Sequence, residues 1–363
     1  MSRTHLSFEF SCKDPAGPQF RAAVGEHLGV FLDRKQAQLT EVSPLLTPLC
    51  EVAREFTATG KRLRPAFGYW GFTAVADQPG DPGVLLTALA GFELLHASAL
   101  VHDDVIDDSD LRRGQPAVHR RLAQWHRAHH GSGDADAFGR AGAILLGDLM
   151  MAWSVEITEG SGLEPELLAR GRSVLDAVRT EVNAGQFLDM SAEAELTAQQ
   201  DPIAVAEKVV EYKTARYTVI RPLQYGAALA GADPALLSTL AAIGSPLGRA
   251  FQLRDDLLGV FGDEQLTGKP AGDDLRENKR TVLVAEGLAR SSELAGFLGR
   301  PLGENELAHA RALLIDTGAV QAVEQRIDTD AAKCRELVAE LEITEEGHTA
   351  LTRLVEACVS RDS

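Results

Sequence analysis

The sequence has few cysteines and a deficit of basic residues. Its four cysteines lie far apart, at Cys12, Cys50, Cys334 and Cys358. Because no two of them are close in sequence, a disulfide framework is not expected. We expect free thiols in a reducing compartment instead. Lys and Arg number 36 against 53 Asp and Glu, so the formal net charge is -17. Because nucleic acids and anionic membranes are bound by basic surfaces, neither is expected as a partner.

Targeting and membrane-spanning segments are also not expected. The first residues, MSRTHLSFEFSCKD, lack the apolar core of a signal peptide. The run from Val84 to Val101 approaches membrane-spanning length, but it contains Glu93 and His96 and continues directly into aspartates. We therefore expect a helix buried in protein, no stable membrane insertion and a cytoplasmic location.

Alternating patterns typical of strands are scarce, and Ala, Leu, Glu and Arg fill most segments at helical spacing. Clusters of Gly, Pro and Asp predict loops at 78–83, 131–134 and 262–274. No linker divides the 363 residues, so one all-α domain over 1–363 is predicted, a helical bundle around a deep central cavity, with residues 1–18 flexible. Helices are expected over 19–40, 44–58, 61–76, 82–108, 116–130, 139–160, 164–192, 201–230, 234–262, 277–298, 304–316, 319–341 and 344–360.

The most informative feature is an aspartate cluster at the end of the apolar run LLHASALVH. Residues four apart share a helix face, so Asp103 with Asp107, and Asp104 with Asp108, would concentrate negative charge on one stripe. Oxygen ligands with few His or Cys beside them suit Mg²⁺ better than zinc, and Mg²⁺ takes further ligands from substrate phosphates. The cluster therefore predicts a diphosphate held by metal, and a solvated acidic helix end is the alternative.

A second aspartate pair lies in FQLRDDLLGVFGD. The apolar surroundings of Asp255 and Asp256 predict a core helix that presents carboxylates inward, and buried carboxylates need a metal or a cation. The alternative is a structural ion pair with Arg254 or Arg249.

Basic residues that suit phosphate lie in two segments. Arg112-Arg113-Gly114 follows the first cluster by one to two turns, and guanidinium groups match phosphate oxygens. The segment GKRLRP, from Gly60 to Pro65, offers backbone N–H groups and cations at a helix start. Taken alone, that segment would more often be a solvated basic turn.

Further residues are candidates for the site, and for each of them an ordinary surface or capping role is the alternative. Lys213 and Thr214 lie in VVEYKTARYTVIRP, and Gln252 stands three residues before the second pair. Lys269 lies in a Gly/Pro loop suited to closing over phosphate. Gln186 and Asp189 in GQFLDM are weaker candidates. The spacing of His126, His129 and His130 could mimic a metal site, but an exposed helix end is favoured.

These motifs, in this order, resemble those of the trans-prenyl diphosphate synthases of the polyprenyl synthetase family. The resemblance runs from Gly60 to Thr281 through GKRLRP, ELLHASALVHDDVIDDSDLRRG, GQFLDM, YKTA, FQLRDDLLGVFGD and GKPAGDDLRENKRT. It implies an all-α isoprenoid synthase fold, a homodimer, and head-to-tail addition of isopentenyl diphosphate to an allylic diphosphate with Mg²⁺, three ions per active site.

The resemblance also implies roles for individual residues. Its metal ligands would be Asp103, Asp107 and Asp255, supported partly through water by Asp104 and Asp256. The allylic diphosphate would be held by Arg112, Lys213 and Lys269. Isopentenyl diphosphate would be held by Lys61, Arg64, His96 and Arg113. The cation formed from the allylic substrate would be stabilised by Gln252 and by the backbone carbonyl of Lys213 or Thr214.

The chain departs from the family pattern in two places. Thr59 stands where the family often has a glycine before Gly60, and Gly259 stands where the second motif usually ends in a third aspartate. The second departure puts any role of a third carboxylate in doubt, though not the role of Asp255.

Product length is expected to depend on the helix before Asp103, whose inward residues recur about every 3.6 positions. One turn before Asp103 lie Ala99 and Ser98, two turns before it lies Leu95, and three turns before it lies Phe92. Family members that stop at the fifteen-carbon product typically carry bulky aromatics at the first level. The small residues here therefore predict geranylgeranyl diphosphate, with Leu95 and Phe92 as the floor.

Other products and other activities remain as alternatives. A farnesyl or longer polyprenyl diphosphate is the first. A terpene cyclase also uses an aspartate-rich motif, but it would not need both GKRLRP and RRG for a second diphosphate. A non-catalytic subunit of a heteromeric synthase would usually have lost the first acid cluster, which is whole here.

Overall fold

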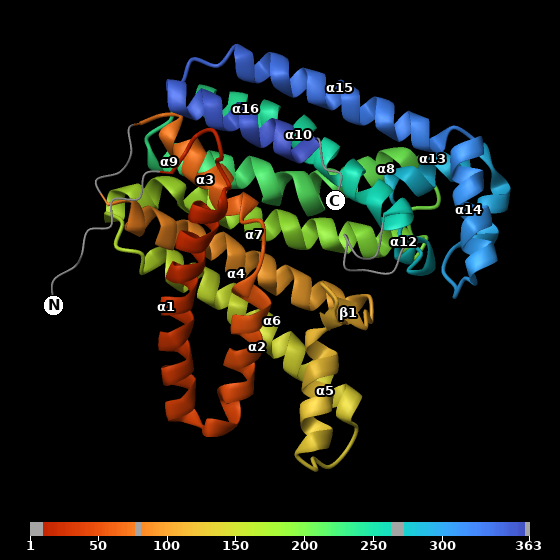
Figure 1. Ribbon diagram of the computed structural model, residues 1–363, viewed down its shortest axis with the longest axis horizontal. Coiled ribbons are helices and arrows are strands. Elements are labelled where there is room, and N and C mark those ends of the chain that lie inside the picture. Colours follow the sequence, from red (N-terminus) through yellow and green to blue (C-terminus); the bar gives the residue numbers. More distant parts are fainter. Residues whose placement is uncertain (1–9, 77–80, 263–271, 360–363) are drawn as a thin grey trace. The chain divides into compact units, whose positions relative to one another are not determined.

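The computed structural model describes residues 10–76, 81–262 and 272–359, and within these ranges the chain is almost entirely helical (Figure 1). The all-α prediction is confirmed. The chain divides into two compact units. Unit 1 comprises Met1–Arg172, Tyr225–Ala232 and Ile343–Ala350, and unit 2 comprises Ser173–Gln224, Asp233–Glu342 and Leu351–Ser363. A single polyprenyl synthetase domain over the whole chain stays a prediction.

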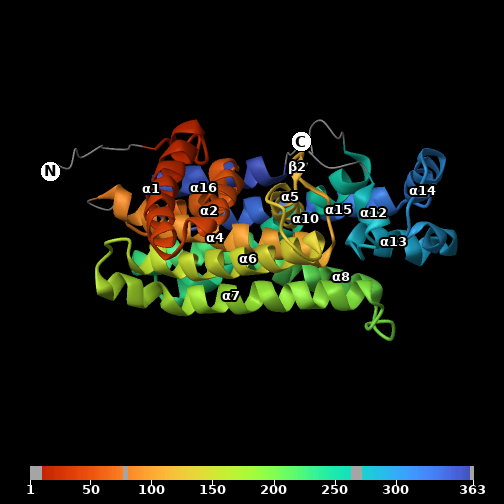
Figure 2. The same cartoon turned by 90° about the horizontal axis from the view of Figure 1, so that it is seen from below.

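Unit 1 is built mainly from helices that precede residue 160. Helices α1 and α2 form an antiparallel pair joined by an exposed turn, and α6 runs alongside α4 in both views (Figures 1 and 2). Its elements are α1 (Pro18–Val42), η1 (Pro44–Leu46), α2 (Thr47–Ala58), α3 (Leu63–Thr73), α4 (Pro82–Ile106), β1 (Leu111–Arg112), β2 (Gln115–Pro116), α5 (Val118–Ala128) and α6 (Ala135–Glu159).

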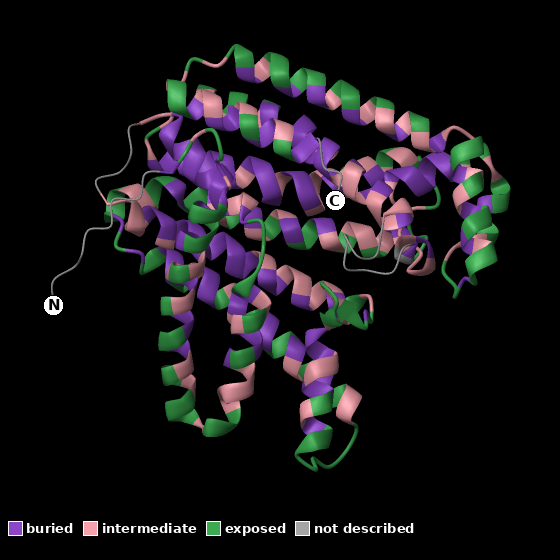
Figure 3. Ribbon diagram, viewed as in Figure 1, coloured by how far each residue is buried: buried purple, intermediate pink, exposed green. Residues whose placement is uncertain are grey.

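Helix α4 is the buried helix of unit 1. The Asp81 side chain caps its start by accepting from the Gly83 N–H at 2.9 Å, and Pro82 occupies a first-turn position. By length and composition α4 and α6 could each cross a membrane, but 72% of the most apolar window of α4 is buried in protein, against 44% for α6. Figure 3 shows the buried residues along α4. The sequence-based prediction of a buried helix over 84–101 is confirmed.

The segment before α1 packs against unit 1 from Phe10 onward. The Phe10 ring lies edge-on to Phe20 and Tyr69, with centroids at 5.1 and 5.3 Å. Trp70 Nε1 donates to the backbone oxygen of Pro15 at 2.8 Å. Residues 1–9 lie outside the described residues, and flexibility over 1–18 stays a prediction.

Unit 2 consists of helices packed on α10 and α15. In Figure 1, α15 runs along α10, and α13 lies beside α15. Helices α7, α9 and α16 have residues in both units. The elements after residue 160 are α7 (Pro165–Glu193), α8 (Pro202–Val209), η2 (Val210–Ile220), α9 (Arg221–Leu229), α10 (Pro234–Phe261), α12 (Asp273–Arg276), α13 (Val282–Arg290), η3 (Ser292–Phe297), α14 (Glu304–Asp316), α15 (Ala319–Ala339) and α16 (Glu345–Val359).

The expected helix over 201–230 contains a π-helical segment, η2. This segment packs closely on α10 through two glycines. A Cβ on Gly248 would lie 2.4 Å from Ala215 Cα, and one on Gly244 would lie 2.7 Å from Ile220 Cγ1. Wide π turns are often found at functional positions, and η2 carries Lys213 and Thr214.

Four expected helix boundaries are wrong for identifiable reasons. Helix α3 begins at Leu63 rather than 61, because Arg62 adopts a left-handed conformation with φ 52°. The expected helix over 277–298 begins only at Val282, where the Thr281 side chain caps it, and it breaks at Ser291, whose extended backbone ends α13. The expected helix start at 116 is instead the second strand of a hairpin.

Close helix contacts in unit 1 give a stability prediction. A Cβ at Gly226 would lie 1.8 Å from the backbone oxygen of Gly68, whereas nothing lies within 4 Å of one at Gly25 in α1. We expect Gly226→Ala to lower the free energy of unfolding by about 2 kcal/mol or more, because backbone must move. Gly25→Ala should raise it by about 0.5–1 kcal/mol, because alanine favours a helix interior. Urea unfolding measures both, and equal shifts would contradict this packing.

Candidate active site

The first aspartate cluster lies at the C-terminal end of α4 in unit 1. Asp103 is half-buried and Asp104 is fully buried. Asp107 terminates the helix, and its backbone N–H donates to the backbone oxygen of Asp103 at 2.8 Å. The expected continuation of the stripe to Asp108 is wrong, because the helix has ended. Asp108 has φ 52° and pairs with Arg120 at 3.0 Å.

A short hairpin places the two arginines of RRG. Strands β1 and β2 pair antiparallel around a two-residue turn at Arg113 and Gly114, with φ of 54° and 73°. Arg112, the last residue of β1, donates from Nε to Asp104 Oδ1 at 2.8 Å, while Arg113 in the turn donates from Nη1 to the backbone oxygen of Thr59 at 3.1 Å.

Arg112 compensates the charge of the cluster. Its Nη2 also contacts Asp104 Oδ1 and lies 3.4 Å from Asp103 Oδ2. Burial alone would lower the pKa of Arg112, but the carboxylates of Asp104, Asp103 and Asp107 raise it overall. The first cluster is therefore a buried arginine–carboxylate network, not a solvated helix end.

The residues expected to hold isopentenyl diphosphate lie in unit 1 around His96. Burial, followed by the charges of Arg64, Arg113, Arg112 and Arg62, lowers the pKa of His96 well below its usual value. An uncharged imidazole surrounded by four guanidinium groups suits an anion. Lys61, the remaining predicted residue, is exposed immediately before Arg62.

The predicted floor residues all lie on α4, but not on one stripe. Ala99 is half-buried and shares the side of Asp103, as does Phe92, because 4 and 11 residues are close to whole turns. Ser98 is fully buried about 140° around the helix from Asp103. The Phe92 ring lies edge-on to Tyr225 of α9, with centroids at 5.5 Å.

The second aspartate cluster lies near the end of α10 in unit 2. Thr214 Oγ1 donates to Gln252 Oε1 at 2.6 Å, and Gln252 Nε2 donates to Asp256 Oδ1 at 2.8 Å. Lys213 Nζ donates to Asp189 Oδ2 at 2.5 Å. The structure thus brings together Lys213, Thr214, Gln252 and Asp256, and adds Asp189, a weaker candidate from the sequence.

Arg254 and Arg249, the expected partners in a structural ion pair, bind carboxylates outside the second cluster. Arg254 makes a bidentate contact with Glu324 at 2.7 and 2.9 Å. Arg249 binds Asp330 at 2.6 Å. A structural ion pair of Asp256 with either arginine is therefore not supported.

Asp256 is a buried carboxylate with one oxygen unsatisfied within the described part of the chain. Its Oδ2 is buried and has no hydrogen-bond partner among the described residues. Burial, opposed by the Gln252 hydrogen bond and reinforced by Asp274, Asp255 and Asp189, raises its pKa to about 8. No group of three or more His, Cys, Asp or Glu side chains is arranged as a metal site in the described ranges. All-oxygen donors that need further ligands fit Mg²⁺ completed by water and phosphate.

Asp274 fills the space above Gly259, the position where the family pattern has a third aspartate. A Cβ at Gly259 would lie 2.1 Å from Asp274 Oδ2. The Gly272 N–H donates to the Gly259 oxygen at 3.0 Å and fixes the start of α12 there. A carboxylate therefore reaches this position from α12 instead of α10.

Two sequence-based expectations remain to be placed. Lys269 lies outside the described residues. Of the three histidines near 126–130, His129 and His130 are exposed, as expected, but His126 is buried and contacts the backbone oxygen of Ser132 at 3.1 Å. The exposed position predicted for His126 is wrong.

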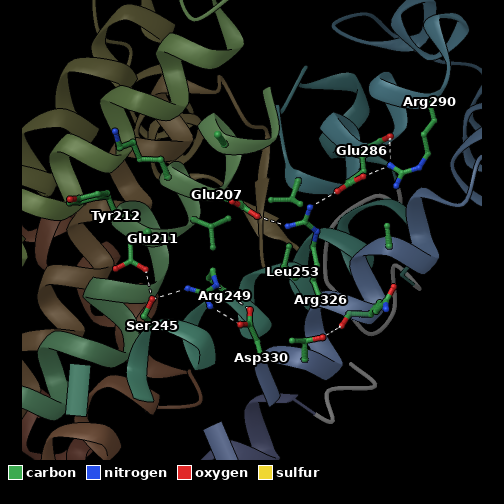
Figure 4. A pocket seen from close by; sticks show the side chains of 17 residues that line it. Glu207, Glu211, Tyr212, Ser245, Arg249, Leu253, Glu286, Arg290, Arg326 and Asp330 are labelled. Carbon is green, nitrogen blue, oxygen red and sulfur yellow. Dashed lines mark hydrogen bonds and ion pairs between the residues drawn. The ribbon is translucent and has the colours of Figure 1, made fainter. Parts of the chain in front are cut away.

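A pocket of about 950 Å³ in unit 2 contains none of the predicted site residues (Figure 4). Most of its charged side chains are paired within the protein. Arg326 binds Glu207 and Glu286, and Arg249 binds Asp330 and Ser245. Four basic and four acidic side chains line it, so this pocket has no surplus positive charge for a diphosphate.

Sequence reasoning missed four residues around the two clusters. Arg62 and Glu93 form a buried ion pair in unit 1, Asp274 occupies the space at Gly259, and Tyr225 contacts Phe92. The clustered bases of GKRLRP gave a signal for Arg62, and the motif GKPAGDDLRENKRT contains Asp274 without indicating its approach to Gly259. No local signal marks Tyr225.

Comparison with known proteins agrees with this chemistry. The sequence model of the family described as Polyprenyl synthetase matches residues 47–312. A geranylgeranyl pyrophosphate synthase from Corynebacterium glutamicum, solved with isoprenyl diphosphate and magnesium, is 38% identical, with a TM-score of 0.89, covering 94% of this chain and 99% of that one. The expected isoprenoid synthase fold is confirmed by this likeness.

Two relatives with curated names are similar over most of their length. A short chain isoprenyl diphosphate synthase from Methanothermobacter thermautotrophicus is 30% identical over 335 residues, 86% of this chain and 95% of that protein. A (2E,6E)-farnesyl diphosphate synthase from Mycobacterium bovis is 34% identical over 268 residues, 71% of this chain and 67% of that protein.

Asp256 should make the metal-free protein less stable as pH rises. Its folded pKa of about 8 exceeds the unfolded value of about 3.9. The folded state therefore holds the proton longer, and the free energy of unfolding falls between about pH 4 and pH 8, by up to about 1.4 kcal/mol per unit. Asp256→Asn should remove about 2 kcal/mol of the loss between pH 5 and pH 7.

Urea unfolding in EDTA at several pH values measures this difference. Asn replacement of the exposed Asp316 serves as the control and should leave the pH dependence unchanged. Parallel curves for wild type and Asp256→Asn would contradict the assignment.

Proposed function

This chain belongs to the polyprenyl synthetase family of trans-prenyl diphosphate synthases, and from that premise we propose its reaction. It adds isopentenyl diphosphate head-to-tail to an allylic diphosphate, with geranylgeranyl diphosphate as product. The observation that carries the proposal is the pair of carboxylate clusters, each built into a buried helix beside basic or amide groups. These are the groups that a metal-bound diphosphate needs.

We propose that Asp103, Asp107 and Asp255 bind Mg²⁺ directly and that Asp104 and Asp256 support it through water. Three ions per active site are expected from the family. Bound Mg²⁺ would neutralise the diphosphate and make it a better leaving group. The buried Oδ2 of Asp256, which lacks a partner in the described residues, supports a cation in the second cluster.

The basic residues divide between two diphosphates. Arg112, Lys213 and Lys269 are proposed to hold the allylic one. The four groups proposed for isopentenyl diphosphate are Lys61, Arg64, His96 and Arg113. The low pKa of His96, caused by burial and by the neighbouring arginines, supports an anion among these groups.

The chemistry then proceeds on the substrates. The allylic C–O bond breaks, the electron pair leaves with the diphosphate, and the alkene of isopentenyl diphosphate forms a new C–C bond to the cation. The released diphosphate takes the proton that restores the double bond. The amide oxygen of Gln252 and the backbone carbonyl of Lys213 or Thr214 are proposed to stabilise the cation by their dipoles. Water must be excluded, since it would quench the cation.

Product length is proposed to depend on α4. The small Ala99, on the side of Asp103, leaves the first level open, and the Phe92–Tyr225 aromatic pair supports a floor deeper down. Leu95 completes the proposed set, whereas Ser98, which the sequence also predicted, lies on another side of α4 and serves as the comparison. Farnesyl diphosphate remains the second candidate product, because the similar Mycobacterium bovis protein is named for it.

The enzyme is proposed to act as a cytoplasmic homodimer. Helix α6 supports the dimer through apolar side chains that unit 1 leaves exposed. Phe138, Ile144 and Leu145 are 42%, 46% and 60% exposed along it. Exposed apolar side chains along one helix are typical of an interface, and a twofold pair would cover them.

Product analysis tests the reaction. We expect purified protein with Mg²⁺, labelled isopentenyl diphosphate and farnesyl diphosphate to form geranylgeranyl diphosphate, and Asp103→Asn and Asp255→Asn to lose about 100-fold or more in kcat. Asp108→Asn, at an exposed carboxylate beyond the helix end, should stay within about threefold.

Two results would count against the proposed reaction. Hydrocarbon released from allylic diphosphate alone would indicate a terpene cyclase. An inactive wild type that becomes active only with another protein would indicate a subunit of a heteromeric synthase.

Product length has its own test. Ala99→Phe places an aromatic ring one turn, about 5.4 Å, before Asp103, and should shorten the main product to fifteen carbons. Chromatography of dephosphorylated products measures this change. Ser98→Phe is the comparison, because Ser98 lies on another side of α4. Products from Ala99→Phe as long as those of wild type would refute the floor.

A further inference from the structure

An ion pair is buried inside the GKRLRP region of unit 1. Arg62 Nη1 donates to Glu93 Oε2 at 2.5 Å, and the two side chains are only 4% and 6% exposed. Taking both charges out of water costs free energy, and a pair of apolar residues would often be as stable. Its presence therefore calls for a role beyond packing.

The pair connects three helices. Arg62 begins α3 in a left-handed conformation, φ 52°, and Glu93 lies within α4. The second guanidinium nitrogen, Nη2, donates to the backbone oxygen of Thr57 in the last turn of α2. Helix-end carbonyls need such partners. One guanidinium group thus fixes the end of α2, the start of α3 and the side of α4.

The loop between α2 and α3 lies against this pair. A Cβ at Gly60 would be 3.6 Å from Arg62 Nη1 and 3.7 Å from Glu93 Oε2, and Gly60 has φ 145°, which favours glycine. Thr59, the residue before it, accepts from Arg113 Nη1. The backbone that carries Lys61 is therefore held between the ion pair and the hairpin arginine.

Glu93 also balances the basic cluster. Burial lowers the pKa of Arg113, the nearby arginines lower it further, and the Glu93 carboxylate opposes both effects. The charges of Arg62, Arg64 and Arg113 all lower the pKa of His96. Without Glu93, Arg62 would be buried without a carboxylate and would add to the repulsion among these arginines.

We propose that the Arg62–Glu93 pair positions the isopentenyl diphosphate site, holding the backbone of Lys61 and Arg64 in place relative to Arg113 without touching substrate. This inference rests on the proposed function of that site. Its consequence is selective. Loosening the pair should weaken isopentenyl diphosphate binding and leave the allylic substrate, which Arg112 and the aspartates are proposed to hold, nearly unaffected.

Steady-state kinetics of Glu93→Gln tests the proposal. Glutamine keeps the shape and removes the charge. We expect KM for isopentenyl diphosphate to rise about 10-fold or more, while kcat at saturation and KM for farnesyl diphosphate change by less than about threefold. Arg62→Lys should give the same pattern, because an ammonium group cannot bridge Glu93 and the Thr57 carbonyl as a guanidinium group does. The change should be smaller, because lysine keeps the positive charge. Arg62→Lys decides the question if Glu93→Gln does not fold.

Lys35→Gln is the matched control. Lys35 is also a buried member of an ion pair in unit 1, with Glu156 of α6, away from GKRLRP. This variant should leave both KM values within about twofold, even if it unfolds at a lower temperature.

Each outcome decides the proposal. Parallel changes in both KM values, or no change in either, would overturn it while leaving the proposed function intact. A wild type that never consumes isopentenyl diphosphate would overturn the proposed function and this inference together.

Discussion

The concentration of carboxylates at the end of a buried helix is the constraint on which unit 1 depends. Helix α4 is apolar along most of its length and ends in Asp103, Asp104 and Asp107. A fully buried carboxylate such as Asp104 costs several kcal/mol unless a cation compensates it. The hairpin after α4 supplies Arg112 for this purpose. The turn at Arg113 and Gly114 then directs the second arginine toward the loop after α2.

Unit 2 meets the same constraint in a different way. Asp256 receives an amide hydrogen bond from Gln252, and the nearby arginines bind other carboxylates. Its pKa of about 8 expresses the cost of a buried charge without a cation. A cluster of this kind is most stable with metal bound, so metal and diphosphate binding and stability should be linked.

The sequence predicted most helices, because helical periodicity and capping residues are local signals. It predicted both acid clusters and the basic residues beside them for the same reason. It could not predict the left-handed Arg62, the ion pair of Arg62 with Glu93, 31 residues away, or the approach of Asp274 to Gly259. The end of α4 before Asp108 was missed because the run of aspartates continues the periodic pattern. Contacts between distant segments decide such details.

The central claim is that the aspartates of each cluster bind Mg²⁺ for a diphosphate substrate. Calorimetric titration of the metal-loaded protein with inorganic pyrophosphate tests it without turnover. We expect one pyrophosphate per chain for wild type, only in the presence of Mg²⁺, and at least about 10-fold weaker binding for Asp103→Asn and for Asp255→Asn alone. Unchanged affinity after the loss of either cluster would contradict the claim.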